Sequence, residues 1–266
     1  PTVRSNGILL AQVVPSGGII SGQSSVVQLD GWNWEDAAYK TDEGIHLNWP
    51  RMYVYKGGNS EPEDVQRNKI QKNLNDLQLY FDEAKAFAQN ASTVSSANLG
   101  ANSKLTEDQN LKFESMRGLF NGTKTLYAHC SYVKEIISAV ALADKFGFRL
   151  VIVGGTDAYR VTDLLKSKNV AVILGRTHSL PPREDDDIDL PYKLPSILAK
   201  AGITYTVSTD GSWQARNLSF NAGTSAAYGL SKEEALMSIT LNAAKILGIN
   251  ATAGSLEEGK DATLIV

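Results

Sequence analysis

The feature that most constrains the fold is a run of apolar strand segments that alternate with amphipathic helical segments in the second half of the chain. Each strand segment is almost continuously apolar, as strands buried on both faces of a parallel sheet are. The intervals between them are long enough for helical crossovers, which predicts a doubly wound sheet or a (β/α)8 barrel. The four strand segments are "KTLYAHC" (124–130), "RLVIVGG" (149–155), "VAVILGR" (170–176) and "ITYTVSTD" (203–210).

The connecting segments decide between these two architectures. After residues 124–130, apolar side chains recur at helical spacing from Val133 to Val140. No helical segment opens with a GxGxxG or Walker pattern, the glycine-rich loops that hold nucleotide phosphates on doubly wound sheets. We therefore predict the TIM-like barrel.

The first half of the chain is less regular. A strand over residues 8–15 is predicted to run into the glycine-rich segment 16–25, which we interpret as a structural turn rather than a wall of a pocket. Apolar residues at helical spacing predict a long helix over 61–90, and the Ser/Asn-rich stretch 90–108 predicts an exposed loop. The acidic run at 183–191 is interpreted as a solvated loop.

Composition limits the classes of partner. The chain has 266 residues and a net charge of -3, which provides no electrostatic reason to expect nucleic acid or an anionic membrane as a partner. Its apolar runs are far shorter than the roughly 20 residues of a membrane span. The single cysteine, Cys130, excludes an internal disulfide and a cysteine-rich metal site. A small-molecule substrate is the expected partner, and a homo-oligomer is compatible with the sequence.

Residues able to do chemistry stand where the predicted strands end, which is where parallel barrels place their reactive groups. His129 ends the first of the four strands, Arg176 and His178 follow the third, and Asp210 ends the fourth; His46 has no assigned place. Imidazole and carboxylate groups are ligands of divalent metals such as zinc, and an Asp near the metal can take a proton from water. The alternatives are an Asp that makes a strand-end turn and a His packed in the core.

Five stretches of the sequence carry a resemblance to a known family: "PSGGIISGQSSVVQLDGWNWEDA", "LYAHC", "TYTVSTDGS", "EEALMSITLNAAKILGI" and "GSLEEGKDATLIV". Together they resemble the amidohydrolase superfamily, in its imidazolonepropionase-like branch. This resemblance implies a barrel over residues 1–253 that is incomplete on its N-terminal side, and a return segment, 254–266, leading toward a β-sandwich.

The resemblance also implies roles for individual residues. His129 is similar to the metal-site histidine of barrel strand 5, and Asp210 to the strand 8 aspartate that binds metal and accepts the proton of the attacking water. The strand 6 histidine of the family is replaced by Gly154 and Gly155. His178, as a catalytic group, or Arg176, as a substrate-binding group, would then polarise the substrate carbonyl.

Members of the family carry a His-x-His pair on the first barrel strand, and this sequence contains none. The chain also begins at Pro1 and stops inside the apparent strand "ATLIV". We therefore expect a fragment of a longer bacterial protein. The fragment taken alone is expected to be inactive and to hold no stoichiometric metal, since two ligands seldom hold a catalytic zinc.

The predicted function is a metal-dependent hydrolase, with zinc as the expected metal, that cleaves C–N bonds of amides or cyclic amides. The alternative is a binding or scaffold protein that kept the barrel and lost its full metal site. An unrelated aldolase-type barrel would need a catalytic lysine near the C-terminal end of a strand, and none of the clear strands has one. Because the branch includes exported bacterial proteins, the resemblance favours the periplasm over the cytoplasm.

Overall fold

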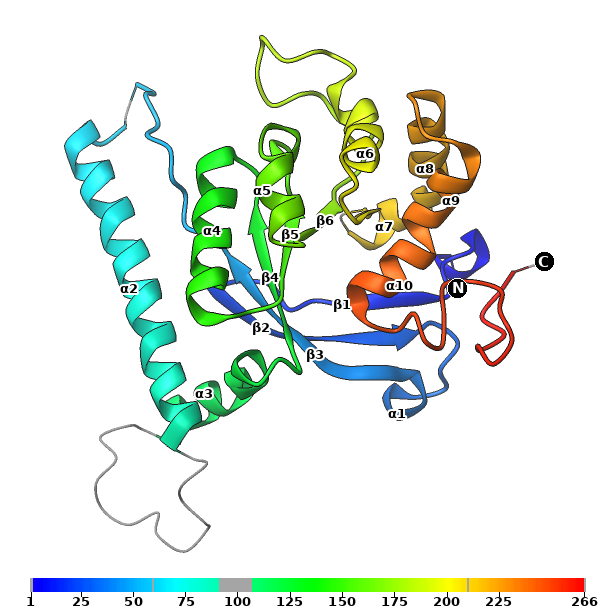
Figure 1. Ribbon diagram of the computed structural model, residues 1–266, viewed down its shortest axis with the longest axis horizontal. Coiled ribbons are helices and arrows are strands. Elements are labelled where there is room, and N and C mark those ends of the chain that lie inside the picture. Colours follow the sequence, from blue (N-terminus) through cyan, green and yellow to red (C-terminus); the bar gives the residue numbers. More distant parts are fainter. Residues whose placement is uncertain (1, 59, 91–106, 210, 266) are drawn as a thin grey trace, which may run out of the picture.

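The computed structural model describes residues 2–58, 60–90, 107–209 and 211–265. One seven-stranded sheet runs through these residues, and its strands lie side by side in chain order (Figure 1). The first three strands are antiparallel neighbours: β1 (Leu10–Val13), β2 (Ile20–Gln28) and β3 (Ala38–Asn48).

From β3 onward every neighbouring pair of strands is parallel. The four strands predicted from the sequence are confirmed, each somewhat shorter than its apolar segment. The result is a curled half-barrel sheet whose parallel strands all end on the same side. These strands are β4 (Thr125–Cys130), β5 (Leu150–Gly154), β6 (Ala171–Leu174) and β7 (Tyr205–Val207).

Helices connect the parallel strands, as the crossover rule requires. Helix α4 (Val133–Phe146) is followed by Gly147, a glycine in the left-handed region with a φ of 76° that caps its end. A short 3-10 helix, η2 (Ala158–Arg160), precedes α5. The remaining helices are η1 (Arg4–Asn6), α1 (Trp34–Ala37), α3 (Glu107–Phe120), α4 (Val133–Phe146), α5 (Thr162–Ser167), α6 (Leu190–Ala201), α7 (Ser212–Ala215), α8 (Leu218–Ala227), α9 (Lys232–Ile239) and α10 (Leu241–Leu247).

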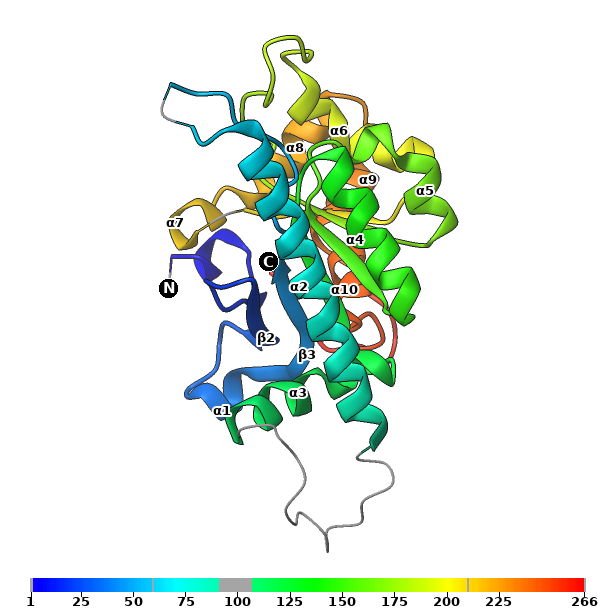
Figure 2. The same cartoon turned by 90° about the vertical axis from the view of Figure 1, so that its left-hand side faces the viewer.

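The long helix predicted over 61–90 is confirmed as α2 (Glu63–Asn90). Figure 2 shows it running the length of the molecule in front of β3 and α4. Its Phe81 is fully buried and packs against Phe146 and Phe148, with ring centroids 5.7 and 5.5 Å apart. Burial of such aromatic rings attaches the helix to the outside of the sheet.

Three segments differ from what their sequence predicts or lie mostly outside the described residues. Residues 20–25, interpreted as part of a glycine-rich turn, belong to β2. The apparent strand in "ATLIV" is not formed, because no strand of the described residues lies beside residues 262–265 to complete a ladder. Most of the loop predicted at 90–108 lies outside the described residues.

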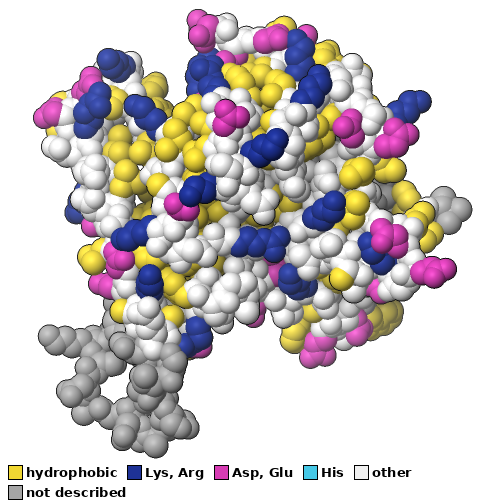
Figure 3. Space-filling view, in the orientation of Figure 1, with side chains coloured by type: hydrophobic (Ala, Val, Ile, Leu, Met, Phe, Trp, Pro, Cys, Tyr) yellow, Lys and Arg dark blue, Asp and Glu magenta, His cyan; other side chains and the backbone are white. Residues whose placement is uncertain are grey.

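The acidic run is not simply solvated. The side chain of Asp186 is only 3% exposed, since it forms ion pairs with Arg160 and Arg183. Elsewhere, the face in Figure 3 shows acidic and basic side chains interspersed, without a large area of one sign. Within the described part of the chain, none of the helices has the length and apolar character of a membrane span.

Candidate functional site

A pocket of about 410 Å³ lies at the carboxyl ends of the parallel strands. Its wall takes Trp49 from the segment after β3, His129 from β4, Gly154 from β5, Gly175 after β6 and Ser208 after β7. Parallel strands bring their ends together at one edge of the sheet, which is where barrel enzymes hold their reactive groups. The position predicted for the site from the strand ends therefore coincides with a real pocket.

One residue of this wall, His129, contacts a second histidine, His46, which is buried. His46 Nδ1 and His129 Nε2 lie 2.8 Å apart, so one nitrogen donates and the other accepts, according to tautomer. Burial, followed by the proximity of His129, lowers the pKa of His46 to about 3. His46 is therefore a neutral imidazole throughout the ordinary pH range.

The position of His46 is set by Tyr127. The two rings stack with centroids 4.6 Å apart and planes 8° from parallel. Gly44 makes this possible, because a Cβ at that position would collide with the Tyr127 ring. A residue with any side chain at 44 would displace the ring on which His46 rests.

A chain of hydrogen bonds across four strands holds Tyr127 in turn. Its hydroxyl donates to Glu43 Oε2 at 2.8 Å, while Ser24 and Gln12 donate to Glu43 Oε1 at 2.6 and 2.5 Å. Burial, with the charge of Glu43, raises the pKa of Tyr127, which keeps the phenol protonated and donating. These buried groups fix the β1–β4 register beneath the histidines.

The donor atoms match a divalent metal in kind. Zinc binds neutral imidazole nitrogen, and a catalytic zinc takes three protein ligands. While the two histidines are hydrogen-bonded to each other, the pair keeps one free imidazole lone pair, and among the described residues no group of three or more His, Cys, Asp or Glu is placed to hold an ion. Asp210, the other predicted ligand, lies outside the described residues.

Arg176 and His178 lie on the segment after β6, and both are exposed. His178 Nε2 is 2.6 Å from Thr224 Oγ1, and its ring meets Tyr192 edge-on. Neither residue belongs to the described wall of the pocket that holds His129. The structure thus brings His46, rather than these two residues, to His129.

Gly154 is the last residue of β5, the strand end at which the resemblance led us to expect a histidine. Its φ is +100°, a conformation that side-chain-bearing residues rarely adopt, and an added Cβ would lie 2.9 Å from Ser131 Oγ. A histidine could not be placed here without moving the loop after β4. The local backbone conformation therefore favours glycine at position 154.

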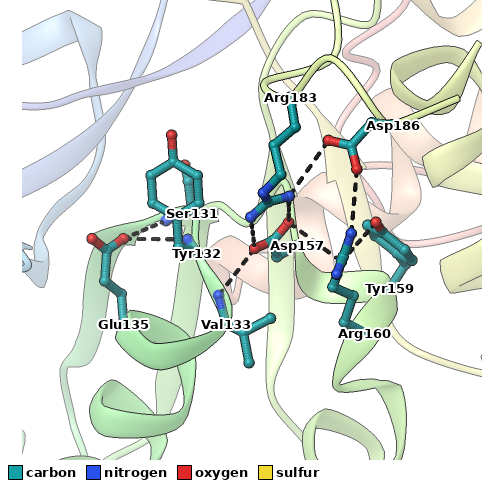
Figure 4. Close-up of polar contacts among 9 residues, drawn as sticks. All are labelled: Ser131, Tyr132, Val133, Glu135, Asp157, Tyr159, Arg160, Arg183 and Asp186. Atoms are coloured by element: carbon teal, nitrogen blue, oxygen red, sulfur yellow. Dashed lines mark hydrogen bonds and ion pairs between the residues drawn. The ribbon is translucent and has the colours of Figure 1, made fainter. Parts of the chain in front are cut away.

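Ion pairs brace the loops around the pocket (Figure 4). Asp157, whose side chain is 1% exposed, accepts two hydrogen bonds from Arg183, at 2.8 and 2.6 Å, and one from the Val133 N–H at 3.2 Å. Burial acts to raise the pKa of Asp157, but the hydrogen bonds from Arg183 and Val133 outweigh it, and the pKa is lowered. A charged Asp157 thereby joins the loops that follow β4, β5 and β6.

The sequence alone did not indicate that His46 contacts His129. A histidine near the end of an apolar strand was the available signal, but its partner lies 83 positions away in the chain. Trp49 and the hydrogen-bond chain through Glu43 were missed for the same reason, because they depend on strand register rather than on local spacing.

The comparisons with known proteins agree with this architecture. A family model described as the amidohydrolase family matches residues 97–266. A solved amidohydrolase from Thermotoga maritima is 23% identical, with a TM-score of 0.79 over 98% of this chain and 66% of that chain. This likeness supports the fold, and the present chain spans 66% of that protein's length. No curated protein matches the sequence.

Two other solved structures are more distant. A putative prolidase from Bifidobacterium longum is 19% identical, with a TM-score of 0.43 over 69% of this chain and 52% of that chain. A beta-aspartyl dipeptidase from Fervidobacterium islandicum is 17% identical, with a TM-score of 0.41 over 60% and 48%. Similarity at this level carries no argument about the present chain.

Proposed function

The chain belongs to the amidohydrolase family. On that premise we propose that it functions as a metal-dependent hydrolase of C–N bonds, in amides or cyclic amides. The observation that carries this proposal is His129 on the wall of a pocket at the strand ends, with its ring hydrogen-bonded to the buried His46. His129 thus offers an imidazole ligand at the edge of the sheet where substrates reach barrel enzymes. We further propose that the chain is part of the imidazolonepropionase-like branch.

In this proposal His129 and Asp210 are metal ligands. The metal, when bound, would supply an activated water at neutral pH. His46 holds the His129 ring by the hydrogen bond between them, as partners of metal-binding histidines commonly do. Asp210 takes the proton from the attacking water and passes it to the leaving nitrogen. His178 or Arg176 would stabilise the developing charge on the carbonyl oxygen, which requires the segment after β6 to bring one of them to the pocket, since neither lines its described wall.

A second candidate function is binding without catalysis. The observation in its favour is Gly154, whose backbone conformation excludes the histidine that the family carries there. A barrel that has lost a ligand can still bind small molecules, since fold does not fix function.

The test is metal analysis together with amide hydrolysis, on the protein expressed from its complete gene. We expect about one zinc per chain, less in Asp210→Asn and His129→Ala, and hydrolysis lost in both variants. Asp163→Asn, an exposed carboxylate on α5, is the matched control and should keep metal and activity. Absence of both metal and hydrolysis in the unaltered protein would reject the hydrolase in favour of the binding protein.

A further inference from the structure

A second cavity, of about 260 Å³, lies at the opposite edge of the sheet from the pocket that holds His129. Its wall includes Leu150, the first residue of β5, Ala171, the first residue of β6, and Thr204, which directly precedes β7. The cavity therefore lies at the amino ends of these parallel strands. Because barrel enzymes carry out their chemistry at the carboxyl ends, a ligand in this cavity would have a role separate from hydrolysis.

The charge of the cavity is of one sign. Among the described residues of its wall three are cationic and none is acidic. Arg149 directly precedes β5, Lys166 lies in the last turn of α5, and Lys245 lies in the last turn of α10. A cleft lined by one sign of charge concentrates ions of the other sign. The net charge of the chain is -3, so composition alone does not predict such a cluster.

The two lysines, Lys166 and Lys245, have no carboxylate partner within the described part of the chain. The neighbouring Lys168 provides the contrast, since its Nζ pairs with Asp144 at 2.7 Å. A lysine in the last turn of a helix is favourable because that end carries partial negative charge. This explains each position taken singly, but it does not explain why three cations surround one cavity without a counter-ion.

Glycines let these cations approach closely. A Cβ at Gly202 would lie 3.3 Å from Lys166 Nζ, so the ammonium group is held against the turn that precedes β7. A Cβ at Gly248 would lie 3.8 Å from Arg149 Nη1 and 2.8 Å from the Nζ of Lys40. Lys40 therefore adds a fourth positive charge beside Arg149.

The backbone fixes Arg149 without using all its donors. Its Nη2 donates to the carbonyl oxygens of Lys245 and Ile246, at 3.1 and 3.2 Å. Its Nε and Nη1 have no hydrogen-bond partner among the described residues and remain able to donate. The turn that follows Lys166 is closed by a hydrogen bond of 3.1 Å from the N–H of Asn169 to the Lys166 carbonyl. The cations thus stand on ordered elements, which lowers the cost of binding a ligand.

We propose that this cavity binds the phosphate group of a small anion. Cations on three separate elements can meet a tetrahedral oxyanion from several sides, whereas a carboxylate accepts hydrogen bonds in one plane. Ammonium groups bind phosphate as point charges, and a guanidinium binds it through its N–H groups. A volume of about 260 Å³ is below the roughly 300–1,000 Å³ of pockets for drug-sized ligands, which limits the ligand to one such as pyrophosphate or a phosphate monoester.

The experiment is calorimetric titration with inorganic pyrophosphate, on the protein expressed from its complete gene. The protein is first treated with a chelator and dialysed, so that a metal in the other pocket does not bind the probe. We expect about one pyrophosphate per chain, because such sites are few in a protein. Salt at about 0.15 M screens charges more than about 8 Å from the anion.

Three variants locate the site. Lys166→Met and Lys245→Met should each weaken binding by about 10-fold, the usual effect of removing a charged hydrogen bond, and the double variant should weaken it further. Both side chains are exposed, so the variants should fold, and urea unfolding checks this. Lys168→Met is the matched control, since it removes a cation from the same turn that does not line the cavity, and it should keep the affinity.

Absence of pyrophosphate binding would overturn the proposal, as would equal affinity in the double variant and the unaltered protein. Citrate, an anion of similar charge that bears only carboxylates, should bind more weakly, and citrate binding as tight as that of pyrophosphate would reject the phosphate assignment. Phenyl phosphate and inorganic phosphate distinguish the sources of the group. Tightest binding of phenyl phosphate would identify an organic phosphate as the ligand, and tightest binding of pyrophosphate an inorganic diphosphate. Both results depend on the same lysines, and neither depends on the hydrolase activity.

Discussion

His46 Nδ1 lies 2.8 Å from His129 Nε2, and this hydrogen bond joins strand β3 to strand β4 at the base of the pocket. The two histidines are far apart in the sequence, and parallel pairing of the strands brings them together. The bond fixes the orientation of the His129 ring and couples its tautomer to that of His46.

Removing His46 should therefore act through His129. In His46→Phe the ring can still stack on Tyr127, but the hydrogen bond is lost. We expect zinc affinity to fall by about 10- to 100-fold, the usual effect of removing the partner of a metal-binding histidine. Zinc titration with a competing chelator measures this. Unchanged affinity in a folded variant would show that His46 only fills space.

The conformation of Gly154 predicts a loss of stability on adding a methyl group. Gly154→Ala should lower the free energy of unfolding by about 1–3 kcal/mol, because the backbone would be strained and the Cβ would press on Ser131. Gly175→Ala is the matched control, since nothing lies within 4 Å of an added Cβ there. Urea unfolding of both variants tests the difference; similar losses would contradict it.

The Asp157–Arg183 pair predicts a large effect from removing one partner. Arg183→Met leaves a buried carboxylate without its two strongest hydrogen bonds, and should cost about 3 kcal/mol of stability. Arg67→Met breaks an exposed pair with Glu63 and should cost about 0.5 kcal/mol or less. Thermal and urea unfolding compare the two, and a small loss in Arg183→Met would mean that Asp157 is satisfied by other groups.

The same carboxylate makes stability depend on pH. Because the pKa of Asp157 is lowered on folding, its contribution is complete above the unfolded value of about 4 and is lost as pH falls through the folded value. Unfolding free energies measured between pH 6 and pH 2.5 should thus fall more steeply for the unaltered protein than for Asp157→Asn. Parallel curves would contradict this assignment.

Part of the site was predictable from the sequence, because it depends on local order. Apolar runs of strand length predicted β4 to β7, and the rule that reactive groups stand at strand ends singled out His129. Arg176 and His178 followed from the same rule, yet both are exposed on the segment after β6. Nearness to a strand end in sequence does not determine which way a loop carries its side chains.

By itself, the sequence determined the parallel strands, the long helix α2 and the edge of the sheet at which chemistry would be sought, since these follow from hydrophobic periodicity. Only the tertiary structure decided that His46 meets His129 and that the charged Asp157 pairs with Arg183. These relationships join residues from separate strands and loops. Their energies depend on register and burial, which exist only once the chain has packed.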